Sequence, residues 1–283
     1  MSSTTTTTTG SFTASDGTPI AYTSSQEVGE EGAEEVVLLV HGYAASAGIN
    51  WVMPGVFAAL AGDETVGKKV VVAVDMRGHG ASGKSGDPEV YAGMRMAMDC
   101  AELLAHLGGE KDMVVDVVGY SMGAKVSLGL AVNLPTLMPE GSVAVKLRSL
   151  TLSGHGVGMT TPWEGGPPFA HALENGLREG LSAFDSAMFD FVAQAGCDVP
   201  SMAAVARSTR FVTPEQVSES LALPTLLLSG TEDASVEPLE DFAALVSNQD
   251  LVTIVRVPGS HATAPAHPDY ASSLISFINN TLA

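Results

Sequence analysis

Short apolar runs, many rich in β-branched residues, alternate along the chain with longer stretches in which apolar positions recur at helical spacing. Strands that are apolar at nearly every position are typical of a sheet buried on both faces. Their alternation with helices predicts a parallel α/β sheet. The predicted strands are residues 35–40, 69–74, 113–118, 147–152, 225–228 and 251–257.

The remaining segments near the N-terminus predict a hairpin and a tail. Asp16-Gly17 lies between two short segments with strand character, residues 11–15 and 19–24, and Asp-Gly is a strong hairpin signal. Residues 1–10 are predicted to be a disordered tail because they consist mainly of Ser and Thr. The helices predicted between the strands are residues 51–60, 90–107, 122–134, 238–247 and 269–282.

The alternation of strands and helices breaks once, at residues 154–222. No strand is predicted there, and residues 169–180 and 181–195 have helical character. Such an insertion is too long for an ordinary connection and predicts a helical cap over the strand ends, where open α/β sheets bind ligands. We therefore expect a tail (1–10), a core (11–153 and 223–283) and a cap (154–222).

Composition narrows the range of functions. The 283 residues include 13 Lys and Arg against 32 Asp and Glu, a net charge of −19, which disfavours nucleic acids and anionic membranes as partners. The only cysteines, Cys100 and Cys197, are expected to be free thiols, and no metal or cofactor site is predicted. Without an apolar signal segment or an apolar run long enough to span a bilayer, the chain is expected to be cytoplasmic.

The strongest chemical motif is Gly119-Tyr120-Ser121-Met122-Gly123, which joins a predicted strand to a predicted helix. A serine in so tight a turn has its hydroxyl exposed above the sheet, and the flanking glycines let strand and helix approach closely. The N-terminus of the helix offers positive potential to an oxyanion. The position of the motif between a predicted strand and a predicted helix, more than the five residues themselves, makes Ser121 a candidate nucleophile.

A serine nucleophile needs a base and an orienting carboxylate. Glu232 and Asp233 follow the strand predicted at residues 225–228, and His261 follows the strand predicted at residues 251–257. All of these groups therefore lie at one edge of the sheet. Glu232 stays open as an alternative acid, and His267 as an alternative base.

Taken together, these motifs resemble the α/β-hydrolase family over nearly the whole chain from Ser11. The motifs that carry the resemblance are His41-Gly42, Asp75-Met76-Arg77-Gly78-His79-Gly80, Gly119-Tyr120-Ser121-Met122-Gly123, Gly230-Thr231-Glu232-Asp233 and Gly259-Ser260-His261. The resemblance implies an eight-stranded, mostly parallel sheet with helices on both faces and a helical cap after the sixth strand.

By the same resemblance Ser121 is the nucleophile, His261 the general base and Asp233 the orienting carboxylate. The backbone N–H groups of Tyr43 and Met122 would form the oxyanion hole. A serine at the elbow excludes the family's haloalkane dehalogenases and epoxide hydrolases, which use an aspartate there.

The expected substrate is a small-molecule ester that binds beneath the cap. Its predicted contacts are Tyr43, Trp51, Met122, His155, Trp163 and Phe189. The simplest prediction is a carboxylesterase. A hydrolase of carbon–carbon bonds in β-diketone-like substrates and a slow or non-catalytic ligand receptor remain alternatives, and the sequence does not specify an oligomeric state.

Overall fold

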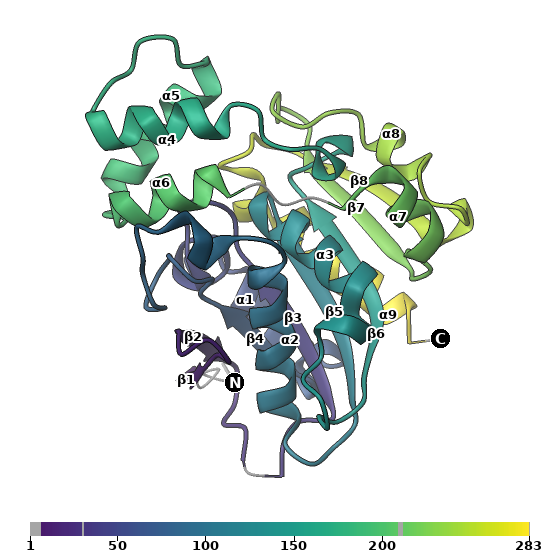
Figure 1. Ribbon diagram of the computed structural model, residues 1–283. Coiled ribbons are helices and arrows are strands. Elements are labelled where there is room, and N and C mark those ends of the chain that lie inside the picture. Colours follow the sequence, from purple (N-terminus) through teal and green to yellow (C-terminus); the bar gives the residue numbers. More distant parts are fainter. Residues whose placement is uncertain (1–6, 30, 209–211, 283) are drawn as a thin grey trace.

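An eight-stranded sheet forms the centre of the molecule (Figure 1). The computed structural model describes residues 7–29, 31–208 and 212–282. The strand order is β1-β2-β4-β3-β5-β6-β7-β8. Strand β2 runs antiparallel to both of its neighbours, β1 and β4, and the six strands from β4 to β8 in this order are parallel. The strands are β1 (Thr8–Thr13), β2 (Pro19–Ser24), β3 (Glu35–Val40), β4 (Val70–Val74), β5 (Met113–Tyr120), β6 (Val145–Ser153), β7 (Thr225–Gly230) and β8 (Val252–Val257).

The first strand begins inside the segment that was predicted to be a disordered tail. Strand β1 already begins at Thr8, which pairs with Ser24, so the strand includes three residues that were assigned to a disordered tail. Alternating Thr, Ser and Phe residues suit a half-exposed edge strand, because β-branched and aromatic side chains favour extended backbone. Residues 1–6 of the predicted tail lie outside the described part of the chain.

Helices cover both faces of the sheet (Figure 1). Val36, Leu38 and Val40 of β3 face one side, whereas Val37 and Leu39 face the other, and all five are fully buried. The first side packs against α2 (Arg95–Gly108), α3 (Met122–Leu137), α7 (Pro214–Ser220) and α8 (Leu239–Ala243); the second packs against α1 (Val56–Gly62) and α9 (Pro268–Asn280). Burial on both faces explains why the strands are continuously apolar.

Two helices begin later than the periodicity predicts. The helix expected at residues 51–60 is split into a short π-helical turn, η1 (Gly48–Val52), and α1, because Gly55 between them has a positive φ of 85°. The helix expected at residues 90–107 begins at Arg95, after Gly93 with a φ of 61°. In both cases a glycine with a positive φ interrupts the helical backbone, although the helical spacing of apolar residues continues through it.

The insertion after β6 forms the predicted helical cap, seen at the upper left of Figure 1. Its helices α4 (Gly166–Asn175), α5 (Ala183–Gln194) and α6 (Val199–Arg207) share a small apolar cluster that includes Phe169, Val192 and Met202. Helix α7 also falls within residues 154–222 but packs onto the main core through Val217. Among the described helices, none combines the length and the apolar character that crossing a membrane requires.

A buried ion pair lies within the sheet, at an irregularity of β5. Asp116, where the register with β6 shifts, accepts hydrogen bonds from Lys69 Nζ at 3.0 Å and from Ser149 Oγ at 2.6 Å. The side chains of Lys69 and Asp116 are 1% and 0% exposed, and Arg148 pairs with the same carboxylate. A buried charge of this kind is tolerated only while its partner is present.

We expect Asp116→Ala to lower the free energy of unfolding by about 3–5 kcal/mol, because it leaves the Lys69 ammonium buried without its carboxylate. Denaturant unfolding followed by circular dichroism measures the change. The control is Glu240→Gln, which breaks an exposed pair with Arg256 and should leave the midpoint unchanged. Equal effects of the two substitutions would contradict the assigned role of the buried pair.

Candidate active site

Three strands bring the predicted chemical residues to one edge of the sheet. Ser121 follows β5, Asp233 lies in the turn after β7, and His261 lies in the turn after β8. Because β5, β6, β7 and β8 are parallel neighbours, their carboxyl ends meet at the same edge. The cap helices lie over that edge (Figure 1).

Ser121 occupies a strained turn between β5 and α3. Its φ of 55° and ψ of −116° are unusual for a residue with a side chain, and its N–H donates to the carbonyl of Ser153 at 2.7 Å. The turn is held by close backbone approach. A Cβ atom on Gly123 would lie 2.1 Å from the carbonyl oxygen of Val40, and one on Gly119 would lie 2.3 Å from that of Gly123. Only glycine fits at either position.

The side chains of Ser121, His261 and Asp233 form one hydrogen-bonded chain. His261 Nε2 lies 3.1 Å from Ser121 Oγ, and His261 Nδ1 lies 2.7 Å from Asp233 Oδ2. With Nδ1–H donating to the carboxylate, the lone pair on Nε2 is free to accept the serine proton. The arrangement has the geometry of a serine nucleophile with its base and orienting acid.

Asp233 stays ionised because of its hydrogen bonds. Burial alone would raise the pKa of this carboxyl, which is 1% exposed, but hydrogen bonds from His261 and Ser235, together with the charge of His261, bring the pKa below its ordinary value. Glu232, the alternative acid, is exposed. His267, the alternative base, instead caps α9 by accepting from the N–H of Asp269 at 3.3 Å.

Ser235 is a site residue that the sequence reading missed. Its Oγ donates to Asp233 Oδ1 at 2.5 Å and lies 3.2 Å from His261 Nδ1, while its N–H donates to the same carboxylate oxygen at 3.1 Å. The bond from the Ser235 N–H closes an Asx turn. The sequence Asp-Ala-Ser was therefore the signal that could have predicted this contact. Ser235 thus fixes the carboxylate oxygen that does not contact His261.

The predicted oxyanion donors lie on both sides of Ser121. Met122 is the first residue of α3, so its N–H has no acceptor within the helix. Tyr43 follows Gly42, whose N–H donates to Asn50 Oδ1 at 2.7 Å and where an added Cβ would lie 3.2 Å from that of Ser121. The loop before α1 therefore lies directly against the serine.

His41 shapes that loop without joining the chemistry. Its Nε2 accepts from the N–H of Met76 at 3.0 Å, so its Nδ1 carries the proton and donates to the carbonyl of Gly42 at 2.7 Å. Complete burial lowers the pKa of His41 to about 4, so the ring is neutral. The Tyr43 hydroxyl extends the loop's contacts to the cap by donating to the carbonyl of Met202 at 2.8 Å.

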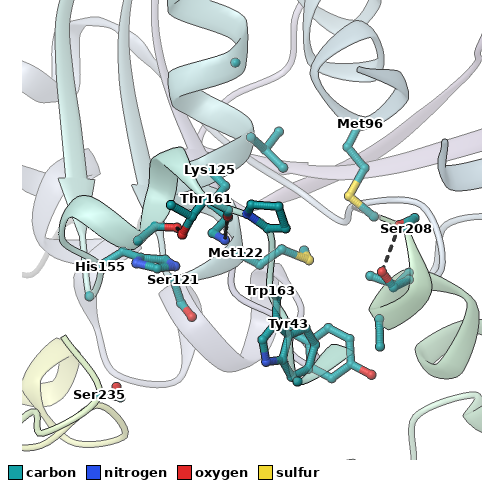
Figure 2. Close-up of a pocket in the computed structure, with 18 of the residues that line it drawn as sticks. Tyr43, Met96, Ser121, Met122, Lys125, His155, Thr161, Trp163, Ser208 and Ser235 are labelled. Carbon is teal, nitrogen blue, oxygen red and sulfur yellow. Dashed lines mark hydrogen bonds between the residues drawn. The ribbon is translucent and has the colours of Figure 1, made fainter. Parts of the chain in front are cut away.

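A cavity of about 510 Å³ lies between the cap and Ser121 (Figure 2). Ser121 and His261 line it together with four of the predicted substrate contacts, Tyr43, Met122, His155 and Trp163. The sequence reading missed Lys125 of α3 and the wall formed by Met94, Met96 and Ala97 at the start of α2. The sequence indicates where these residues lie along their helices. It does not show that the cap leaves these parts of α2 and α3 open to a cavity.

Two predicted substrate contacts were wrong, because they lie outside the cavity lining. Trp51 is fully buried in the core beneath the sheet edge, where its ring packs edge-on against Tyr120 at 6.4 Å between centroids. Phe189 packs within the cap, and the Arg178 guanidinium lies over its ring at 4.7 Å. Both aromatic side chains hold elements together, whereas Phe184 and Met188 of the same cap helix reach the cavity.

No metal cluster accompanies these residues. Within the described part of the chain, no three His, Cys, Asp or Glu side chains are grouped as ligands of a metal ion would be.

Comparisons with known proteins identify the family of the chain. A sequence model described as the alpha/beta hydrolase family matches residues 37–271. No curated protein matches the chain at a significant level.

Solved structures with the same fold have diverse activities. A thermophilic esterase from Thermogutta terrifontis is 20% identical with a TM-score of 0.67, and the match covers 97% of this chain and 99% of that one. An esterase from Rhodococcus sp. is 22% identical with a TM-score of 0.63, covering 96% and 99%. A bottromycin epimerase, 20% identical with a TM-score of 0.63 over 97% and 99%, shows that the fold also carries other chemistry.

We expect Gly123→Ala to destabilise the protein by about 3 kcal/mol or more, because the added methyl group meets the Val40 carbonyl and backbone cannot yield as a side chain can. Thermal and denaturant unfolding provide the measurement. The matched control is Gly62→Ala at the end of α1, where a Cβ meets no atom within 4 Å and the change should be neutral or slightly stabilising. A Gly123 variant as stable as the wild type would contradict the close-approach argument.

Proposed function

Because the chain belongs to the alpha/beta hydrolase family, we propose that it is a serine hydrolase that cleaves small to medium-sized apolar carboxylic esters. The observation that carries the proposal is the hydrogen-bonded chain from Ser121 through His261 to Asp233. Ser121 and His261 of this chain line the cavity. Acyl transfer requires a nucleophile, a base whose free lone pair faces that nucleophile, and a buried carboxylate.

The first half of the reaction forms an acyl-enzyme. Ser121 Oγ bonds to the ester carbonyl carbon as its proton moves to His261 Nε2, and the carbonyl π electrons move onto oxygen. The N–H groups of Tyr43 and Met122 stabilise that oxyanion, aided by the positive N-terminal end of α3. The C–O bond to the alcohol then breaks, and the leaving oxygen takes the proton from His261.

The second half returns the enzyme to its starting state. A water molecule gives a proton to His261 Nε2 as its oxygen bonds to the acyl carbon. Collapse of this second tetrahedral intermediate releases the carboxylic acid, and Ser121 Oγ recovers the proton. In both halves the ionised Asp233 stabilises the imidazolium through the 2.7 Å bond to Nδ1.

The cavity supports an apolar substrate of limited size. Its volume of about 510 Å³ lies in the range of small-molecule sites, and the side of α3 beyond Met122 presents Val126 and Gly129 toward the methionines of α2. Thioether side chains adapt to apolar groups of different shape. This wall favours an aliphatic ester over a highly charged one.

We expect a fluorophosphonate probe to label the wild-type protein at Ser121, and Ser121→Ala to abolish the label. The same substitution should lower kcat for short p-nitrophenyl esters about 10⁴-fold or more, because it removes the nucleophile. The control is Ser272→Ala on the exposed face of α9, which should keep both the label and the turnover. A folded wild-type protein that resists the probe would overturn the proposed function.

A graded series tests the acid. We expect Asp233→Asn to lower kcat about a thousandfold or more, because a neutral amide neither orients the base in the right tautomer nor stabilises its charged form. Ser235→Ala should lower kcat about tenfold, less than Asp233→Asn does, because it removes a bond to the carboxylate but leaves the acid in place. Glu232→Gln should retain the wild-type rate. Near-normal turnover in Asp233→Asn with a large loss in Glu232→Gln would reverse the assignment.

A further inference from the structure

Lys125 places a positive charge inside the cavity, on the same face of α3 as the nucleophile. It follows Ser121 by four residues, about one helical turn, and both side chains line the cavity (Figure 2). Its Nζ donates one hydrogen bond, to the carbonyl of Thr161 at 3.1 Å. An ammonium group has three N–H donors, so this neutral acceptor leaves two of them for other partners.

No carboxylate neutralises this ammonium directly. In residues 7–29, 31–208 and 212–282, no Asp or Glu oxygen lies within 4.0 Å of Lys125 Nζ. Partial burial lowers the pKa of Lys125, and the charge of Glu237 works in the opposite direction. Since removing a cation from water is costly without a counter-ion, this position suits an anionic group brought by a ligand.

The other charged groups around the cavity are occupied or lie at its edge. Glu237 Oε2 accepts from the N–H of Gly156 at 3.3 Å and faces His155 Nδ1 at 3.6 Å. Burial lowers the pKa of His155, so this ring is neutral near pH 7. Glu164 lines the cavity from an exposed position, and His261 is engaged with Asp233.

The cavity therefore has two chemically different ends (Figure 2). Lys125, His155 and Thr161 gather at one end. Met96 lies toward the other, along the α3 face that carries Val126 and Gly129. A Cβ on Gly129 would lie 2.4 Å from the terminal methyl of Met94, so this glycine makes room for the thioether wall.

Resting on the proposed ester hydrolysis, we propose that the substrates are esters that carry one carboxylate close to the scissile group. The carboxylate accepts hydrogen bonds from Lys125 Nζ, the reacting carbonyl lies at Ser121 Oγ, and an aliphatic portion fills the methionine-lined end. Because Lys125 lies one helical turn from Ser121, the carboxylate is expected to be joined to the ester carbonyl by a short spacer. Half-esters of short dicarboxylic acids have this chemistry.

The test compares esters that differ only in charge. The monobutyl esters of succinic, glutaric and adipic acid are each paired with the neutral butyl ester whose free carboxyl is a carboxamide. A second set carries the carboxylate or carboxamide on the alcohol side. All are measured at 0.15 M salt, where the Debye length of about 8 Å limits repulsion by the net charge of −19. The readout is the ratio of kcat/KM for the charged member to that for the neutral member.

We expect a ratio of about 10 or more for at least one spacer in the wild-type protein. Lys125→Met should reduce that ratio about tenfold to a hundredfold, the range for a lost hydrogen bond to a charged group, whereas Lys125→Arg should keep most of it. The matched control is Lys146→Met, which removes an exposed lysine at the opposite end of β6 and should leave the ratio unchanged. A wild-type ratio near 1 in both sets, or a ratio that Lys125→Met leaves intact, would overturn the proposal.

A binding measurement separates this inference from the proposed function. The same pairs are titrated calorimetrically into Ser121→Ala protein, with and without Lys125→Met. Binding of a charged member that is at least tenfold tighter than binding of its neutral partner, and that Lys125→Met abolishes, supports the carboxylate site. If the wild-type protein nevertheless hydrolyses none of the esters, only the hydrolase proposal is overturned. Turnover of neutral esters without any carboxylate preference in binding would overturn the carboxylate site and leave the hydrolase proposal standing.

Discussion

The contact between the first turn of α3 and the end of β3 is the constraint on which the site depends. The backbone of Gly123 lies so close to the Val40 carbonyl that no side chain fits between them. This approach fixes the start of α3, and the turn that connects β5 to it is so short that Ser121 takes a positive φ. The same contact directs the N-terminal end of α3, the serine hydroxyl and the loop after β3 toward one point. One packing contact between two backbone segments thus places three groups that the proposed acyl transfer requires.

The loop after β3 passes this constraint on to the cap. Its Gly42 lies against Ser121, and its Tyr43 hydroxyl donates to the Met202 carbonyl in α6, so a single loop contacts both Ser121 and the cap. The Cys197 thiol adds a second link by donating to the carbonyl of Ala44, at 3.1 Å. A shift of α6 relative to the sheet would therefore move the backbone next to Tyr43, whose N–H is the proposed oxyanion donor. The position of the cap and the position of the proposed oxyanion donor are thus connected through this loop.

The sequence was most informative where chemistry and backbone geometry coincide. The strands, the sheet and the cap follow from the alternation of apolar runs with helical stretches and from the one break in it. The contact among Ser121, His261 and Asp233 follows from their positions at strand ends, because parallel strands bring such positions together. It was least informative about the cavity walls. An aromatic residue such as Trp51 fills the core as readily as it lines a pocket, and only the three-dimensional path of the chain at Gly55 distinguishes the two. Lys125 was missed for a related reason, since a lysine on a helix is ordinarily solvated and only the cap above α3 places it in a cavity.

Charge is the basis of the selectivity proposed for the same site. The chain has only 13 basic side chains against 32 acidic ones, and several of the basic ones are held in ion pairs, such as Lys69 with Asp116 and Arg77 with Asp99. A net charge of −19 repels anions from most of the surface, so an anionic substrate gains attraction only where a cation is present without a carboxylate beside it. Lys125 meets that condition in the cavity that Ser121 also lines. Because the long-range field is screened over roughly 8 Å at physiological salt while a partly buried pair is screened much less, the local attraction persists where the general repulsion fades. An acidic surface and the proposed carboxylate site are therefore compatible.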